Sequence, residues 1–109
     1  MVESTERDTI HIFRTLHNTA RVYKNKVATE VVEIERRAGG AKFSDVQHLV
    51  YGARGRKVYE TGDVDHGIWS AGIALGLIKD IPTCKELIGR IEREVEEIVG
   101  GLVNLKAKL

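Results

Sequence analysis

The length of the chain sets the first limit on its fold. A chain of 109 residues has room for one hydrophobic core of modest size. A closed eight-fold β/α barrel needs about 250 residues, so we expect a single domain over residues 1–109 and no complete barrel. Hydrophobic residues make up 42% of the sequence and charged residues 30%, a balance typical of a folded soluble protein rather than a disordered one.

The charge balance argues against polyanionic partners. Lys and Arg number 17 and Asp and Glu 16, a net charge of +1, so no strong field draws the chain toward nucleic acid or an anionic membrane. Three cations, Arg54, Arg56 and Lys57, follow one another in a glycine-containing stretch. They are suited either to contacting a phosphate or to forming a solvated surface. We expect no nucleic-acid partner.

The sequence also favours a cytoplasmic location without a membrane span. Its one cysteine, Cys84, has no partner for an internal disulfide, and the first twenty residues contain no apolar stretch of the kind a signal peptide needs. The longest apolar run, residues 68–78, spans eleven residues, whereas a membrane-crossing helix needs about 20. We interpret this run as part of a buried helix.

The first half of the chain predicts a β-hairpin followed by a helix. Residues 9–24 mix β-branched and aromatic side chains with partial alternation, and a turn is expected at residues 17–18. Apolar residues then recur at helical spacing over residues 26–38. Asn25 can cap this helix, residues 39–40 (Gly-Gly) can end it, and Glu35 is placed with other charged residues on its solvated face.

Further helices are expected in the second half. A capping box of Ser44 and Gln47 predicts a short helix through Leu49, and residues 52–57 are predicted to be a loop. A buried helix is expected over residues 63–78. A second capping box at residues 83–86 predicts a last helix with an apolar stripe, ending near residues 100–101, with a flexible tail over 101–109. The fold class is therefore helix-rich α+β, a hairpin followed by about four helices.

The residues alone identify no catalytic site. The four histidines do not stand at the spacing of a metal site on one element, and nothing assembles into a nucleophile, base and orienting group. His66 and Cys84 are placed in first turns of helices, where the dipole acts on their pKa values, although ordinary surface roles are favoured. Gly72 and Gly76, one helical turn apart, indicate close approach by a helix, a strand or a flat ligand.

Two segments carry a resemblance to a known family. Residues 62–72 (GDVDHGIWSAG) and 76–88 (GLIKDIPTCKELI) closely resemble the carboxyl-terminal end of the 2-nitropropane dioxygenase family. This family includes nitronate monooxygenases, related NAD(P)H-dependent FMN oxidoreductases and flavin-dependent enoyl-ACP reductases. Residues 13–16, 18–22 and 52–56 are also similar to it, so the resemblance covers residues 5–100.

The resemblance implies a part of an enzyme with no catalytic residue of its own. Family members carry an FMN-binding (β/α)₈ barrel whose catalytic histidine and glycine-rich phosphate loops precede the matched region, and these motifs are absent from the present sequence. The matched region is the substrate-side domain with the helices that close over the barrel. By this resemblance Trp69, Ser70 and Gly72 line the cofactor and substrate pocket. Ile73 departs from the family, which commonly has Gln there.

Two hypotheses follow. In the first, the chain is a stand-alone carboxyl-terminal module of a nitronate monooxygenase-like, FMN-dependent oxidoreductase; it shapes the substrate pocket, binds no FMN alone and works with a separate FMN-barrel partner chain. In the second, it is a non-catalytic helical module that forms a homo-oligomer, because two long apolar helices in so small a chain leave apolar surface uncovered. The two hypotheses are compatible.

Overall fold

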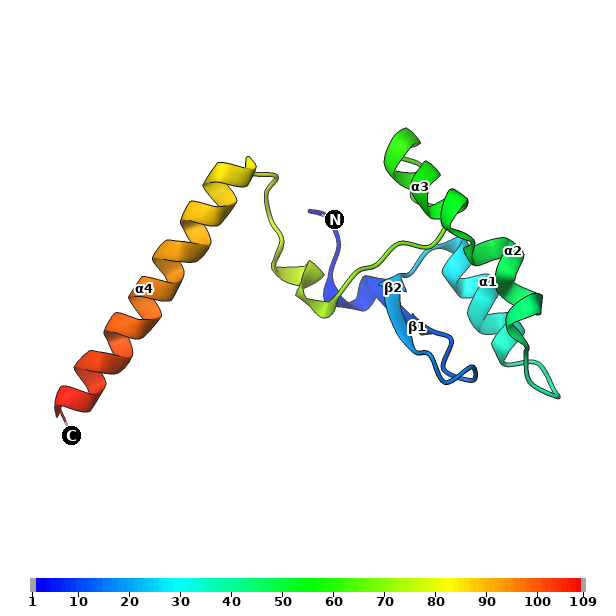
Figure 1. Ribbon diagram of the computed structural model, residues 1–109, viewed down its shortest axis with the longest axis horizontal. Coiled ribbons are helices and arrows are strands. Elements are labelled where there is room, and N and C mark those ends of the chain that lie inside the picture. Colours follow the sequence, from blue (N-terminus) through cyan, green and yellow to red (C-terminus); the bar gives the residue numbers. More distant parts are fainter. Residues whose placement is uncertain (1, 109) are drawn as a thin grey trace. The chain divides into compact units, whose positions relative to one another are not determined.

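The computed structural model describes residues 2–108, with side chains up to residue 106. The chain divides into two units, Met1–Lys79 and Asp80–Leu109, and each is described by itself. The first unit contains, in chain order, η1 (Glu6–Asp8), β1 (Thr9–Ile12), β2 (Ala20–Tyr23), α1 (Lys26–Glu35), α2 (Phe43–Val50), α3 (Gly52–Thr61) and η2 (Ile73–Leu77) (Figure 1). The second contains α4 (Cys84–Lys108).

The expected fold class is confirmed: the described residues are helix-rich, begin with an antiparallel hairpin and close no barrel. Strands β1 and β2 pair with Ile10 opposite Val22. The connecting loop has positive φ angles at Phe13 (61°) and His17 (55°). The chain reversal therefore includes His17, where the turn was predicted, but already begins at Phe13. That both units form a single domain remains a prediction.

One face of the hairpin packs against α1 and α2 to form the main core. Ile12 and Val22 from the strands are buried against a stripe of α1 residues at spacings of three and four, and α2 adds two more buried side chains. These eight residues are Ile12, Val22, Val27, Ala28, Val31, Ile34, Val46 and Leu49. Burial of their apolar surface is the main stabilising contribution that fixes the hairpin on the helices.

Helix α1 begins where the sequence predicts and ends earlier. The Asn25 side-chain oxygen accepts a hydrogen bond from the Ala28 N–H at 2.8 Å, which confirms the cap. The helix ends at Glu35. The expected end at residues 39–40 is wrong because the chain turns away from residue 36 onward, and Gly39 and Gly40 then adopt φ angles of 95° and 76°, which favour glycine.

Helices α2 and α3 correct two predictions. Helix α2 begins at Phe43, before Ser44, and its first turn is capped by the Asp45 carboxylate, which accepts from the Lys42 N–H at 2.8 Å; the predicted Ser44–Gln47 box is wrong. Residues 52–57 are not a loop but the first turns of α3. Packing overrides the weak helical propensity of this stretch, because its last turns bury Val58.

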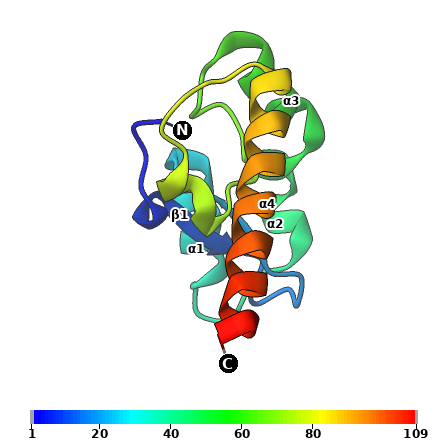
Figure 2. The same cartoon turned by 90° about the vertical axis from the view of Figure 1, so that its left-hand side faces the viewer.

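The second unit is dominated by α4, one unbroken helix in both views (Figures 1 and 2). Its predicted capping box is confirmed: the Glu86 carboxylate accepts from the Thr83 N–H at 2.8 Å, and the Thr83 hydroxyl accepts from the Glu86 N–H at 3.3 Å. The helix passes through Gly100 and Gly101 instead of ending there. Two glycines cost about 1 kcal/mol each in a helix, and the good helix formers around them sustain it.

The predicted apolar stripe of α4 is exposed on the described chain. Its large side chains retain between 44% and 65% of their accessible surface: Leu87, Ile88, Ile91, Val95, Ile98, Val99 and Leu102. Residues 101–108 continue the helix, the flexibility expected of residues 101–109 remains a prediction, and Leu109 lies outside the described residues. Such a stripe is typical of a helix face that packs against another surface.

The Glu86 cap makes the start of α4 dependent on pH. Hydrogen bonds from the Thr83 hydroxyl and N–H lower the pKa of Glu86 from its ordinary value of about 4.5. The stabilisation that the ionised cap gives the helix start is therefore fully present above that value, and it is lost as the pH falls through the lower folded-state pKa. We expect first-turn helicity, followed by carbon chemical shifts of residues 84–87, to fall in acid. Glu86→Gln removes this transition, whereas Glu92→Gln, beyond the cap, retains it. An acid transition that persists in Glu86→Gln contradicts the prediction.

Candidate functional site

The three residues that the resemblance places at a pocket lie on one segment, residues 63–72, which we call the strap. It joins α3 to η2 and is extended and turned, not helical. The predicted buried helix over residues 63–78 is therefore wrong, and only Ile73–Leu77 form a short 3₁₀ helix. His66 consequently lies in a turn, with its N–H donating to the Asp63 carbonyl at 3.2 Å, and not at a helix start.

The backbone of the strap pairs with β2 instead of forming helical bonds. Ser70 makes an antiparallel bridge with Val22, and the Tyr23 N–H donates to the Trp69 carbonyl at 3.1 Å. These bonds place the strap along the edge of β2 that β1 leaves free. Backbone groups must find partners somewhere, and here an adjacent strand edge provides them, an arrangement that a local apolar pattern does not reveal.

Asn25 ties the strap to the start of α1. Its side-chain amide donates to the Val64 carbonyl at 2.6 Å and to the Gly67 carbonyl at 2.8 Å, while its oxygen caps the helix. The side chain is buried, at 6% exposure. The sequence identified Asn25 as a cap but carries no local signal for the second role, because the two carbonyls lie about forty residues further along the chain.

Helix α3 holds the other side of the strap. The Arg54 guanidinium donates through Nε to the His66 carbonyl at 2.8 Å. A Cβ atom on Gly67 would lie 2.6 Å from the Arg54 carbonyl carbon, closer than real contacts allow, so this glycine is required for the approach of the two backbones. The strap is therefore clamped between the first turns of α1 and α3.

A surface ion pair adds to this attachment. The Asp65 carboxylate accepts from the Lys26 N–H at 3.2 Å and pairs with the Lys26 ammonium at 3.3 Å. The backbone hydrogen bond from Lys26 is the main reason that the pKa of Asp65 is lowered from its ordinary value. Both side chains are solvent-exposed, so the pair orients the strap more than it stabilises it.

Trp69 is a packing residue of the strap. Its ring stacks on Tyr23 with centroids 4.4 Å apart and an interplanar angle of 18°, and its indole N–H donates to the Val64 carbonyl at 3.2 Å. With Val58, Ala71 and Leu75 it forms a second small core. One face of the indole is thus occupied within the unit, and 8% of the residue's surface is exposed.

Ser70 and Gly72 are exposed, and the two glycines of the sequence pattern behave differently. A Cβ on Gly72 would meet nothing within 4 Å, whereas a Cβ on Gly76 would lie 2.8 Å from a carboxylate oxygen of Glu6. Close packing within the first unit thus accounts for Gly76, where η1 approaches η2. Nothing in the first unit fills the space beside Gly72, which lies at the end of the strap next to exposed Ile73.

The remaining candidates are placed as follows. Cys84 is exposed and is the first residue of α4, as expected. Of the three clustered cations, Arg54 holds the strap, Arg56 donates to the Glu60 carboxylate at 2.6 Å, and Lys57 is exposed on α3. Two of the three are thus engaged within the protein.

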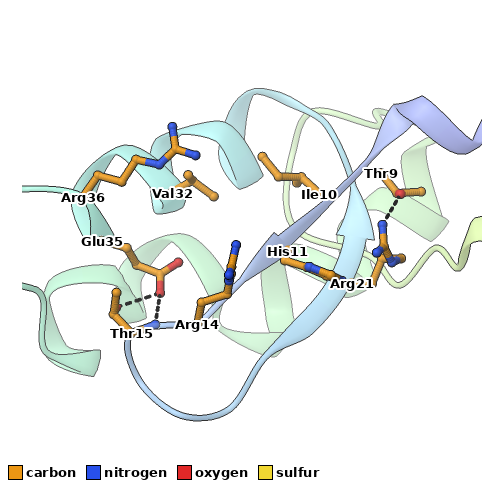
Figure 3. Close-up of a pocket in the computed structure, with 9 residues that line it drawn as sticks. All are labelled: Thr9, Ile10, His11, Arg14, Thr15, Arg21, Val32, Glu35 and Arg36. Atoms are coloured by element: carbon orange, nitrogen blue, oxygen red, sulfur yellow. Dashed lines mark hydrogen bonds between the residues drawn. The ribbon is translucent and has the colours of Figure 1, made fainter.

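A separate groove lies between the hairpin and α1 (Figure 3). Glu35 lies at its base and is buried, at 6% exposure, so its expected place on the solvated face is wrong. Its carboxylate accepts from the Phe13 N–H at 2.9 Å and from the Thr15 N–H and hydroxyl at 3.2 and 2.9 Å. Val27, Val31 and Glu35 follow one another at intervals of four residues, which places all three on the same face of the helix. This spacing is the sequence signal that predicts the burial of Glu35.

Comparison with known proteins gives a structural relative. No protein-family model matches the chain. A solved structure of FabK from Thermotoga maritima superposes on 94% of the chain with a TM-score of 0.76 and 29% sequence identity. The chain spans 32% of that protein, about a third of its length. The expected likeness to a part of a 2-nitropropane dioxygenase-like enzyme is supported to this extent.

The described residues offer neither a metal-binding cluster nor a membrane-spanning helix. Residues 2–108 contain no cluster of three or more His, Cys, Asp or Glu side chains placed to hold a metal ion. No helix within the described part of the chain combines the length and apolar character needed to cross a membrane.

Proposed function

We propose that the chain is the substrate-side module of an FMN-dependent oxidoreductase of the nitronate monooxygenase and enoyl-ACP reductase type, and that it acts together with an FMN-binding barrel. The observation that carries the proposal is the likeness to FabK, which extends over almost the whole chain but over a third of FabK. The redox chemistry in such a pair belongs to the flavin, and the module contributes walls of the pocket.

The residues of the strap are better suited to forming one side of a pocket than to enclosing a cofactor. The inner face of Trp69 is stacked on Tyr23, which leaves its edge, the Ser70 side chain and the backbone at Gly72 to meet a ligand. The space beside Gly72 admits the surface of a flat molecule without a clash. The strap is fixed by Asn25 and Arg54, and a rigid support of this kind is what a pocket wall requires.

Ile73 gives the proposed wall an apolar end. The side chain is 65% exposed, where the family resemblance places a glutamine amide. An apolar side chain cannot donate a hydrogen bond to a cofactor or substrate oxygen. The pocket is therefore proposed to hold its ligand by contact and shape at this point.

A chimera tests the proposal. In it, the matching third of Thermotoga maritima FabK is replaced by this chain, and FMN absorbance and NAD(P)H oxidation are measured. We expect the chimera to retain FMN and turnover, whereas the 109-residue chain alone shows neither. FMN binding and turnover by the isolated chain would overturn the proposal, as would a folded, FMN-loaded chimera without any turnover.

Substitutions at the exposed end of the strap test the wall itself. In the chimera, Ser70→Leu and Gly72→Leu are expected to change kcat/KM for the carbon substrate by about 10-fold, the effect of about 1.4 kcal/mol, with FMN absorbance unchanged. Ser44→Leu, at an exposed position of α2, is the matched control and leaves kcat/KM unchanged. Equal effects of all three substitutions contradict the assignment.

The exposed stripe of α4 favours a second candidate function, self-association. Nine large apolar side chains of this helix are at least 44% exposed, the seven of the stripe together with Val103 and Leu105. Burying them against a second copy would remove a large apolar area from water, which favours association. In this alternative the chain is a non-catalytic homo-oligomer.

Light scattering on the purified chain distinguishes the alternatives. A stable dimer or tetramer that Ile91→Arg converts to monomer, and that does not dissociate when the barrel is supplied, favours self-association. A monomer that binds the barrel through the same stripe favours the oxidoreductase module. Glu92→Arg, one residue along the helix on its charged side, is the control and leaves the assembly state unchanged.

A further inference from the structure

The groove between the hairpin and α1 is rich in arginine and has no role in the function proposed above. Its volume is about 590 Å³, within the range of small-molecule sites. Strand β1, the hairpin loop, β2 and α1 with the turn that follows it all contribute lining residues. Those residues are Thr9, Ile10, His11, Arg14, Thr15, Arg21, Val32, Glu35 and Arg36.

The three guanidinium groups of the groove have no ion-pair partner among the described residues. The ion pairs found there involve Lys26, Arg56, His66 and Arg90 instead. Arg21 donates to the Thr9 hydroxyl at 2.8 Å, which orients it but leaves its charge uncompensated. Three like charges in one groove attract an anion that can neutralise them.

Glu35 does not supply that neutralisation fully. Its carboxylate already accepts three hydrogen bonds from the hairpin loop, from Phe13 and Thr15, and these bonds hold the loop that carries Arg14. One buried carboxylate therefore faces three guanidinium groups. The groove keeps an excess of positive charge in a chain whose net charge is only +1.

The cations are spread along the groove instead of meeting at one point. Figure 3 shows Arg36 toward one end and Arg21 toward the other, with Arg14 and His11 between them. Ile10 and Val32 line the side opposite Arg14. This arrangement fits an elongated ligand with several negative charges and an apolar or aromatic portion better than a single small anion.

We propose that this groove binds an organic phosphate with at least two phosphoryl groups, of the nucleoside diphosphate class. Guanidinium groups bind phosphate oxygens through paired, charge-assisted hydrogen bonds. The proposal does not rest on the oxidoreductase function, because none of the lining residues belongs to the strap that forms the proposed pocket wall.

Titration of the full chain tests the proposal without any barrel. ADP, pyrophosphate and adenosine are added separately at low ionic strength, and amide chemical shifts and binding heats are recorded. We expect saturable shifts at His11, Arg14 and Thr15 with ADP, and weaker affinity as salt is raised. If pyrophosphate binds with the same affinity as ADP, the groove recognises the phosphoryl groups alone. If ADP binds more tightly than pyrophosphate, the groove also contacts the nucleoside. Adenosine, which carries no phosphate, is expected not to bind.

Matched arginine variants locate the site. Arg14→Gln and Arg36→Gln, both exposed, are each expected to weaken ADP binding about 10-fold, the loss of one charge-assisted contact. Arg37→Gln makes the same change of charge beside the groove and leaves binding unchanged. The proposal is overturned if millimolar ADP gives no saturable shift, if the three variants behave alike, or if a single-stranded oligonucleotide binds and ADP does not.

Discussion

Asn25→Asp is expected to lower the free energy of unfolding of the first unit by about 3 kcal/mol. The new carboxylate keeps the oxygen that accepts from the Ala28 N–H, so the cap of α1 survives. It replaces the amide that donates to the Val64 and Gly67 carbonyls. The Val64 carbonyl keeps the Trp69 indole N–H as a donor, whereas the buried Gly67 carbonyl loses its side-chain donor, at a cost of about 1–3 kcal/mol. The loss is a large part of the total stability of a small domain.

Denaturant unfolding measures this loss directly. The only tryptophan of the sequence, Trp69, stacks on Tyr23 in the strap, so its fluorescence reports on the segment that is released. Asn25→Ala removes the cap as well and is expected to be no more stable than Asn25→Asp. Asn18→Ala, in the exposed hairpin loop, stays within about 0.5 kcal/mol of the parent. An Asn25→Asp variant as stable as the parent would show that the two amide bonds do not hold the strap.

Gly67→Ala is expected to destabilise the first unit by about 3 kcal/mol, the upper end of the usual cost of overpacking. The added methyl group would meet the Arg54 carbonyl carbon at 2.6 Å and the Gly55 nitrogen at 2.8 Å. These are backbone atoms of α3 that cannot rotate away. The strap and α3 must therefore separate, which also breaks the bond from the Arg54 guanidinium to the His66 carbonyl.

Gly72→Ala is the matched control. The same methyl group at the other end of the strap meets nothing within 4 Å, so stability is expected to stay unchanged or to rise by up to about 1 kcal/mol, because alanine restricts the unfolded chain. Equal thermal unfolding of the two variants would contradict the close approach at Gly67. Since Gly72 belongs to the proposed pocket wall, its substitution separates stability from function.

Local signals in the sequence were sufficient for the hairpin and for the starts of two helices. Asn25 and the pair Thr83 and Glu86 are caps that act within a few residues, and both were predicted correctly. The hairpin follows from alternation over residues 9–24 and a turn near its middle. In each case the hydrogen-bond partners of the backbone groups lie nearby in the chain, so the local sequence pattern is enough to predict the structure.

The sequence failed where partners are distant. The apolar and small residues over 63–78 match a buried helix, but Ser70 and Trp69 find their backbone partners on β2, almost fifty residues earlier. Helix α3 was missed for the opposite reason: Gly52, Gly55 and three cations have weak local preference for a helix, and the helix is selected by burial of Val58. Tertiary contacts override propensity in both segments.

Of the two candidate sites, the sequence pointed to the residues of the strap but not to the arginine groove. The family resemblance placed Trp69, Ser70 and Gly72 on one segment, and the structure places them together on the strap, although their pocket role remains a proposal. The arginine groove was not foreseen, because its cations come from β1–β2, the loop between them and the turn after α1. Only the cross-strand pairing of His11 with Arg21 was implicit in the predicted hairpin.

The attachment of the strap to Asn25 also determines the order in which this unit assembles. The bond from Asn25 to Gly67 joins residues 42 positions apart, so α1, α2 and α3 all lie within the loop that it closes. Closing a long loop carries an entropic penalty that short contacts such as the hairpin avoid. The strap is therefore expected to dock last during folding and to detach first during native-state opening, uncovering the free edge of β2 while the hairpin and its core remain intact.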